Sequence, residues 1–102
     1  MANIGLFKHT RNGWDGMITT LTLCTNARIV PNRKKRGESS PDYFVKAGDS
    51  DLGVGWKATT GGDDPKAYVR ILLDDPSFAA PVQAALFDRE TGADLVWTRR
   101  KE

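Results

Sequence analysis

Cysteine and histidine, which supply much of the metal and catalytic chemistry of proteins, are almost absent from this sequence. Its 102 residues include one cysteine, Cys24, and one histidine, His9. A single cysteine excludes an internal disulfide and is typical of a chain kept in a reducing cytoplasm. The two residues form no Cys/His cluster for zinc, and no third group is placed to make them a nucleophile and its base. The sequence therefore predicts no metal site, no catalytic residue and no enzyme.

Long hydrophobic runs and a strong net charge are missing as well. No apolar stretch approaches the roughly 20 residues that span a bilayer. The first apolar residues are soon followed by Lys8 and His9, so we expect no signal peptide. Fifteen basic and 13 acidic residues leave a net charge of +2, which is too small to imply a polyanionic partner by itself. These absences predict a cytoplasmic protein without membrane contact.

Cofactor signatures are not found either. The acidic pairs at 49–51, 63–64 and 74–75 lack the spacing and the final glutamate of a calcium loop. Gly53-Val54-Gly55 does not extend to a dinucleotide fingerprint. The sequence predicts no cofactor, and its length predicts one domain over residues 1–102.

Alternation of apolar and other residues is present along most of the chain and is typical of β-strands. The clearest strand runs from Ala67 to Leu73 and is stopped by Asp74-Asp75-Pro76. Further strands are expected at residues 3–10, 14–25, 42–47, 52–59 and 93–98, with residues 27–30 as a continuation of the second of these after a bend at Asn26.

Residues 82–88 are compatible with two structures. Pro81 is a suitable first residue of a short helix, because Val82, Ala85 and Leu86 follow it at helical spacing. A strand is favoured, because a short connection at residues 89–92 leads to the β-rich Leu95-Val96-Trp97.

Side-chain directions follow from two local patterns. Asn12-Gly13 predicts a two-residue type I′ hairpin turn, which would place His9 opposite Gly16 and Phe7 opposite Ile18. Trp56 shares its phase with apolar neighbours in residues 52–59, while Gly53 and Gly55 fall on the opposite face. We therefore expect Trp56, and Trp97 by the same argument, in the core.

The fold class follows from the number and spacing of the strands. About seven short strands with hairpin-like connections predict an all-β domain, either a small antiparallel barrel or a sandwich. A partly open barrel of the oligonucleotide-binding type is one option. The charged tail at residues 99–102 is expected to fray.

A basic loop at residues 31–41 is the most suggestive functional feature. Two prolines, a glycine and two serines enclose four consecutive cations, Arg33, Lys34, Lys35 and Arg36. Four like charges on an exposed loop attract phosphates, although short basic runs are usually only solvated. Tyr43, just after the loop, and Tyr68 are the candidate surfaces for base stacking, whereas Trp14 is expected to form a cross-strand pair with Arg11.

Two functional hypotheses follow. The first is a non-enzymatic accessory protein that binds nucleic acid, with single strands the expected target, through Arg33, Lys34, Lys35, Arg36, Tyr43 and Tyr68. The alternative is a protein-interaction or self-assembling module, a homo-oligomer for example, because the edges of short strands can pair with another chain.

Several segments resemble a bacterial family described as domain of unknown function 736. They include Ile4-Gly5-Leu6-Phe7, Leu52-Gly53-Val54-Gly55-Trp56-Lys57 and, most specifically, Leu73-Asp74-Asp75-Pro76-Ser77-Phe78. Ala58 and Gln83 depart from the lysine and the aromatic residue expected at their positions. The resemblance covers nearly the whole chain. It implies a small bacterial protein, often encoded near mobile-element or plasmid genes, and it implies no activity and no catalytic residues.

Overall fold

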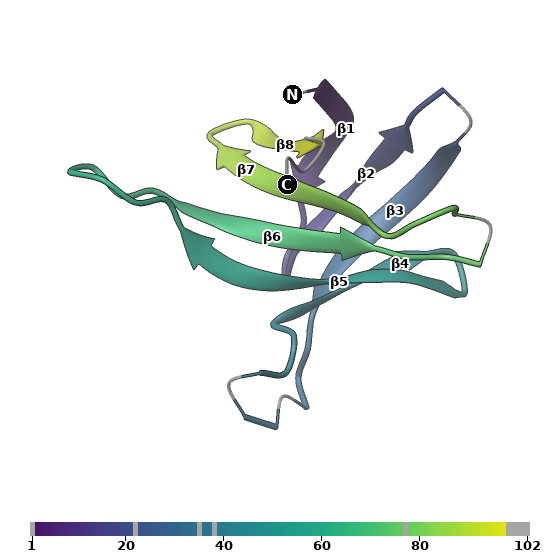
Figure 1. Cartoon of the computed structure of the whole chain (residues 1–102), viewed down its shortest axis with the longest axis horizontal. Coiled ribbons are helices and arrows are strands. Elements are labelled where there is room, and N and C mark those ends of the chain that lie inside the picture. The colour runs from purple at the N-terminus through teal and green to yellow at the C-terminus, as the bar shows by residue number, and fades with distance from the viewer. Residues whose placement is uncertain (1, 22, 35, 38, 77, 98–102) are drawn as a thin grey trace.

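The computed structural model describes residues 2–21, 23–34, 36–37, 39–76 and 78–97. Lys35 and the tail at residues 99–102 lie outside this range. Within it the chain forms strands and connections only (Figure 1). The strands are β1 (Ala2–His9), β2 (Trp14–Thr19), β3 (Cys24–Pro31), β4 (Tyr43–Ala47), β5 (Ser50–Thr59), β6 (Ala67–Leu73), β7 (Val82–Arg89) and β8 (Gly92–Trp97). The described residues contain no helix long and apolar enough to cross a membrane.

The strands form one closed antiparallel barrel. Each strand pairs with the next along the chain, and β8 pairs with β1 to close the ring. The all-β prediction is confirmed, and of its two forms the barrel is the one observed. The oligonucleotide-binding option is wrong in topology, because that fold is a five-stranded Greek key, whereas here eight strands follow one another as a meander.

The core consists of the inward-facing side chains of all eight strands. Among the described residues every buried side chain is apolar. The largest fully buried ones are Ile18, Ile29, Val45, Ile71, Leu73, Leu86 and Leu95. Eight strands leave an interior that side chains just fill, so burial along one face of each strand holds the barrel together. Ala84 and Leu86 alternate inward along β7, which confirms the strand at residues 82–88 and excludes the helix.

The β1–β2 turn differs from the prediction. His9 pairs with Trp14 and Phe7 with Gly16, so the connection has four residues, 10–13, and the type I′ turn is wrong. Neither Asn12 nor Gly13 has the positive φ that such a turn requires. Thr10 closes the turn instead: its N–H donates to the Gly13 carbonyl (2.8 Å), and its hydroxyl accepts from the Gly13 N–H (3.0 Å). The threonine side chain thus selects the longer turn.

A threonine that forms the same pair of hydrogen bonds ends β2 earlier than expected. The Thr20 N–H donates to the Leu23 carbonyl (2.7 Å), and the Thr20 hydroxyl accepts from the Leu23 N–H (3.1 Å). The single strand expected at residues 14–25 is therefore two strands joined by a turn. Sequence propensity treats threonine as a strand former, but its hydroxyl can also replace a ladder hydrogen bond locally. Thr60 forms the corresponding pair of bonds with Lys66 at the base of the β5–β6 loop.

The prediction for β5 is correct at Leu52, which is in the core, and wrong at Trp56, because an irregularity in the β4–β5 pairing beside Leu52 shifts the phase of the residues that follow. Gly55 is buried, and a Cβ added there would lie 2.9 Å from Cδ1 of Ile71 in the core. Trp56 lies on the outer face, where the Arg70 guanidinium is 5.3 Å from the centre of its ring. The core assignment of Trp56 is wrong because larger side chains of neighbouring strands fill the interior above the glycines. Trp97 packs against the core cluster, as expected.

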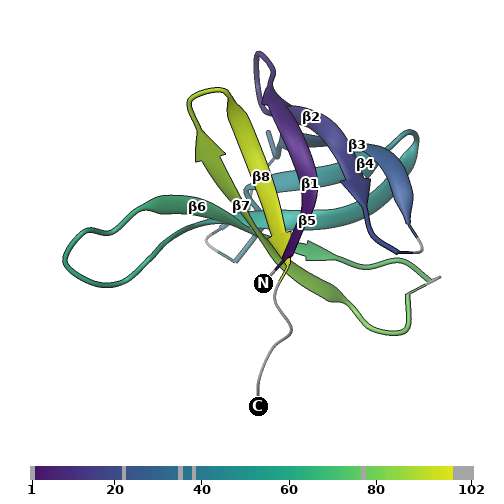
Figure 2. The ribbon, with the colours of Figure 1, turned by 90° about the horizontal axis from the view of Figure 1, so that it is seen from above.

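Connections alternate between the two ends of the barrel. The β1–β2, β3–β4, β5–β6 and β7–β8 connections share one end, which we call the mouth. The β5–β6 hairpin projects from this end as a long arm (Figures 1 and 2). In the arm Lys57 pairs with Val69 and Ala58 with Tyr68, and the pairing of β6 with β7 begins only at Val69. At the opposite end Phe78 packs against the core from the β6–β7 connection.

Gly13 offers a test of the close approach between the β1–β2 turn and β3. A Cβ at Gly13 would lie 1.9 Å from the carbonyl oxygen of Ile29, so Gly13→Ala must push the turn away from β3. We expect the free energy of unfolding, measured in urea, to fall by about 1–3 kcal/mol. Gly61→Ala is the control, because an added Cβ there meets no atom within 4 Å, and it should change stability by less than about 0.5 kcal/mol. Equal stability of the two variants would contradict this account of Gly13.

Candidate functional site

A cavity of about 540 Å³ lies at the mouth, beside the arm. The residues that line the cavity include three aromatic residues, two charged residues and one apolar residue of the core. These are Trp14, Tyr43 and Tyr68, then Lys57 and Asp88, and finally Leu86. Its volume falls within the roughly 300–1,000 Å³ of small-molecule sites, and a mostly apolar wall with a few polar groups is their usual composition.

Trp14 and Tyr43 reach the cavity because each stands at the first position of its strand. Trp14 pairs with the buried Ile29 across β2 and β3, and Tyr43 pairs with Gly55 across β4 and β5. Their side chains therefore continue the inward-facing rows of the core up to the mouth. The two rings meet edge to face, with centroids 5.4 Å apart and planes at 65°. The Tyr43 ring also covers the backbone of Gly55 on the neighbouring strand, which has no side chain of its own.

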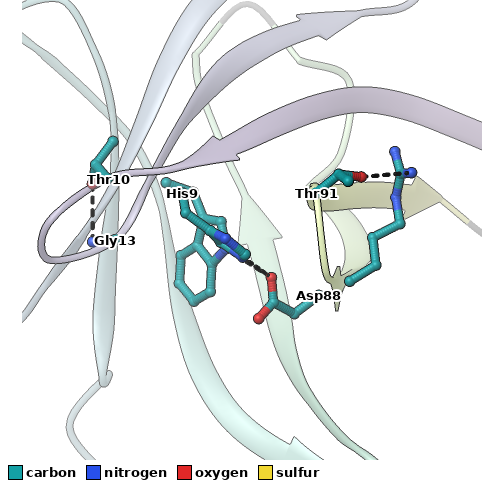
Figure 3. A network of polar contacts seen from close by, with 7 residues as sticks. His9, Thr10, Gly13, Asp88 and Thr91 are labelled. Atoms are coloured by element: carbon teal, nitrogen blue, oxygen red, sulfur yellow. Dashed lines mark hydrogen bonds and ion pairs between the residues drawn. The ribbon is translucent and has the colours of Figure 1, made fainter.

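Asp88 is held at the mouth by two donors from other strands. His9 Nε2 lies 2.5 Å from Asp88 Oδ1, and Trp14 Nε1 donates to the same oxygen at 3.3 Å. Figure 3 shows the His9 ring directed at the carboxylate across the space between β1 and β7. About half of each side chain of the His9–Asp88 pair is exposed, at 45% and 53%. Two bonds to one oxygen fix the direction of the carboxylate.

The pKa of Asp88 is lowered from its ordinary value. Desolvation by burial is the largest single influence and would raise the pKa. It is outweighed by the combined hydrogen bonds from His9 and Trp14, the positive charge of a protonated His9 and a bond from the Arg89 backbone, all of which favour the ionised carboxylate. Asp88 is therefore an anion and a pure hydrogen-bond acceptor over the physiological pH range.

The basic loop lies at the same end of the barrel. Arg33, Lys34 and Arg36 are exposed, and Lys35 lies outside the described residues. Asn32 spans the neck of the loop: its amide donates to the Pro41 carbonyl (2.9 Å) and accepts from the Lys34 N–H (2.9 Å). This neck presents the cations to solvent at the mouth.

Further contacts hold the loop to its neighbours. With the Asn12 amide oriented so that both of its groups are satisfied, its oxygen accepts from the Arg33 guanidinium at 3.1 Å. On the other limb, Trp56 Nε1 donates to the Ser39 carbonyl at 3.3 Å. The Lys57 N–H donates to Asp42 Oδ2 at 2.8 Å, which joins the base of the arm to the end of the loop.

The structure brings some of the predicted site residues together. Tyr43 is half-buried and lines the cavity next to the basic loop, so it is less exposed than expected. Tyr68 is also half-buried and lines the same cavity, while its ring stacks on Phe87 with centroids 5.4 Å apart. Trp14 pairs with His9 rather than with Arg11, so the expected Trp14–Arg11 pair is wrong.

Four residues of the site are absent from the sequence-based prediction. His9 has no partner near it in the sequence, because Asp88 is 79 residues away and no local pattern links the two. Trp14 and Lys57 could have been found only once the strand ends and their shared end of the barrel were known. Cys24 pairs with Thr19 at the far end of β2, and the described part of the chain holds no group of three metal-ligating side chains.

Comparison with known protein families gives a match over nearly the whole chain. The model of the family described as Protein of unknown function (DUF736) matches residues 3–100, a range that contains almost all of β1 and every later strand. No curated protein and no solved structure matches the chain.

The lowered pKa of Asp88 predicts a specific dependence of stability on pH. A carboxyl whose pKa is lower in the folded state stabilises the fold above its unfolded pKa, about 4, and this stabilisation is lost as pH falls through the folded pKa. We expect wild type to melt above Asp88→Asn at pH 5 and the gap to close towards pH 2, as measured by circular dichroism. Asp63→Asn, in the exposed β5–β6 loop, controls for net charge. A gap for Asp88→Asn that is unchanged down to pH 2 would contradict the lowered pKa.

Proposed function

The chain belongs to the DUF736 family of proteins of unknown function, and because that description assigns no activity we propose a function from the geometry of the mouth. The protein is a non-enzymatic nucleic-acid-binding protein, and single strands are its target. One observation carries the proposal: the basic loop and the aromatic cavity, which are separate features of the sequence, lie at one end of one barrel.

Phosphates are bound by the basic loop in this proposal. Arg33, Lys34 and Arg36 are exposed, and Lys35 belongs to the same run. Each phosphate that such a cation neutralises releases counterions, which supplies affinity without sequence preference. The tip of the arm carries Asp63 and Asp64, which repel phosphates. The nucleic-acid strand is therefore expected to follow the basic loop and to avoid the tip of the arm.

Bases are bound by the aromatic cavity. A base that stacks on an aromatic ring must be free of its own neighbours, which is the normal state of single strands and not of duplexes. Tyr43 is the direct link between the two functions, because it begins β4 two residues after the loop ends at Pro41 and its ring lines the cavity. This connection favours single strands over duplex as the ligand.

The cellular setting is part of the proposal. The exposed free thiol of Cys24 is consistent with the cytoplasm, where thiols stay reduced. The family resemblance supports a bacterial accessory protein of a mobile element.

Neutralising the loop tests the proposal. The double variant Lys34→Gln/Arg36→Gln should weaken binding of a labelled single strand several-fold at about 50 mM salt and reduce the dependence of log affinity on log salt by about 0.7 per lost contact. Fluorescence anisotropy at a series of salt concentrations measures both quantities. The matched control is Arg28→Gln/Lys46→Gln, which removes the same charge from a cross-strand pair on β3 and β4, outside the mouth.

Two outcomes would overturn the proposal. One is the absence of binding by wild type at low salt. The other is an equal loss of affinity in the loop variant and in its charge-matched control, because the loop would then act only through net charge.

A second candidate function, self-assembly, is favoured by the outer face of β1 and β2. Closure of the barrel removes the free strand edges on which the sequence-based argument rested. However, Leu6 and Met17 are cross-strand partners on the outside and are 62% and 44% exposed, and Leu21 is fully exposed at the β2–β3 turn. A second copy of the chain is a partner of matching chemistry for such side chains.

Light scattering with size exclusion tests self-assembly. If it occurs, wild type elutes as an oligomer at low micromolar concentration and Leu6→Ser elutes as a monomer, because the substitution removes apolar area from the contact. Phe87→Ser, on the outer face of β7, is the control. A monomeric wild type at these concentrations would exclude this candidate.

A further inference from the structure

We propose that the mouth cavity is a pocket for one unstacked base and that Asp88 selects bases carrying an exocyclic amine, namely adenine, cytosine and guanine, over thymine and uracil. This inference rests on the proposed function and adds a base preference to it. Binding through the basic loop alone would have no such preference, because phosphates carry no sequence information.

Asp88 is built as a fixed acceptor. His9 and Trp14 both bond to Oδ1, which orients the carboxylate from one side. With the bond from the Arg89 backbone counted as well, the lone pairs of an ionised carboxylate still leave acceptor capacity for a ligand in the cavity that Asp88 lines. The two donors belong to β1 and β2, which are rigid parts of the closed barrel. Orientation by neighbouring side chains is what makes a polar group in a binding pocket selective.

An ionised carboxylate distinguishes the bases by their hydrogen-bonding edges. The exocyclic amines of cytosine, adenine and guanine are donors, and an Asp side chain is a known partner for the cytosine amine. Thymine and uracil have no amine, and their one ring N–H stands between two carbonyl oxygens. Those oxygens are acceptors and repel the carboxylate.

The other groups of the cavity suit a nucleotide better than an ammonium ion. Aromatic rings beside a carboxylate also occur in sites for quaternary ammonium groups. Lys57, however, lines the same cavity and would repel a cation, whereas it can bind the phosphate of a nucleotide whose base lies against Trp14 and Tyr43. A nucleotide can contact all of these groups at once: the lysine through its phosphate, the rings through the face of its base and the carboxylate through its amine.

Homopolymers of equal length separate base preference from charge. Anisotropy titrations would compare labelled oligo(dC) and oligo(dT) of about 12 nucleotides at one salt concentration, so that the phosphate contribution is equal. We expect oligo(dC) to bind at least about fivefold more tightly to wild type. In Asp88→Asn the ratio should fall to near one, because the amide offers a donor as well as an acceptor.

The control variant is Asp94→Asn, which removes the same charge from the Arg89–Asp94 ion pair on β7 and β8. It should keep the ratio of wild type. A melting curve for each variant shows that it is folded at the temperature of the titration.

The Trp14 indole gives a second readout that is independent of affinity. Its N–H donates to Asp88, so its nuclear magnetic resonance signal reports on the carboxylate. Cytidine monophosphate should shift this signal, thymidine monophosphate should shift it much less, and Trp14→Phe identifies it.

The outcomes distinguish this inference from the proposed function. Salt-dependent binding of both oligonucleotides with a ratio near one in wild type leaves the proposed function intact and overturns the base pocket. A preference for oligo(dC) that survives in Asp88→Asn, with no movement of the Trp14 signal, also overturns it. If neither oligonucleotide binds, both proposals fall, and a Trp14 signal that responds to a quaternary ammonium ion instead would identify a cation site.

Discussion

Closure of the barrel by the β1–β8 ladder is the constraint on which the rest of the structure depends. That ladder places Ala93 between Phe7 of β1 and Asp88 of β7, in one row across three strands. His9 follows Phe7 by two residues on the same face and so arrives beside Asp88. Because the barrel is closed, one face of every strand is part of the core. The inward-facing rows of side chains end at the mouth, and Trp14 and Tyr43 are the last residues of their rows.

Elements whose evidence is local could be predicted from the sequence. Alternation identified Ala67–Leu73 with both of its ends correct, and the β-rich partner at residues 95–97 correctly favoured a strand over a helix for β7. Errors arose where two local rules competed. Asn12-Gly13 favours a two-residue turn, but the Thr10 hydroxyl closes a four-residue one. Alternation predicts one phase for the whole of β5, but an irregularity in its pairing with β4 breaks that phase after Leu52, so Leu52 is in the core and Trp56 is on the outer face.

In the candidate site, too, the features with local evidence could be predicted and those that depend on distant strands could not. The basic loop could be found from composition alone, and Tyr43 from its place beside the loop. The pair of His9 and Asp88 could not, because its members are joined only through the closing strand β8. The convergence of loop and cavity is likewise a property of the meander, in which alternate connections return to one end. Sequence reasoning can therefore identify single residues of such a site, whereas the strand order is needed to know which of them lie close together.

The meander also sets how the chain can fold. Seven of the eight ladders join strands that are neighbours in sequence and close short loops, and such contacts form quickly. The eighth brings Ala2 to Trp97 and must gather almost the entire chain. The entropic cost of that closure grows only slowly with loop length, but the β1–β8 ladder alone bears it. A chain in which this ladder is open presents β1 and β8 as unpaired edges, so it is the form most exposed to pairing with another copy.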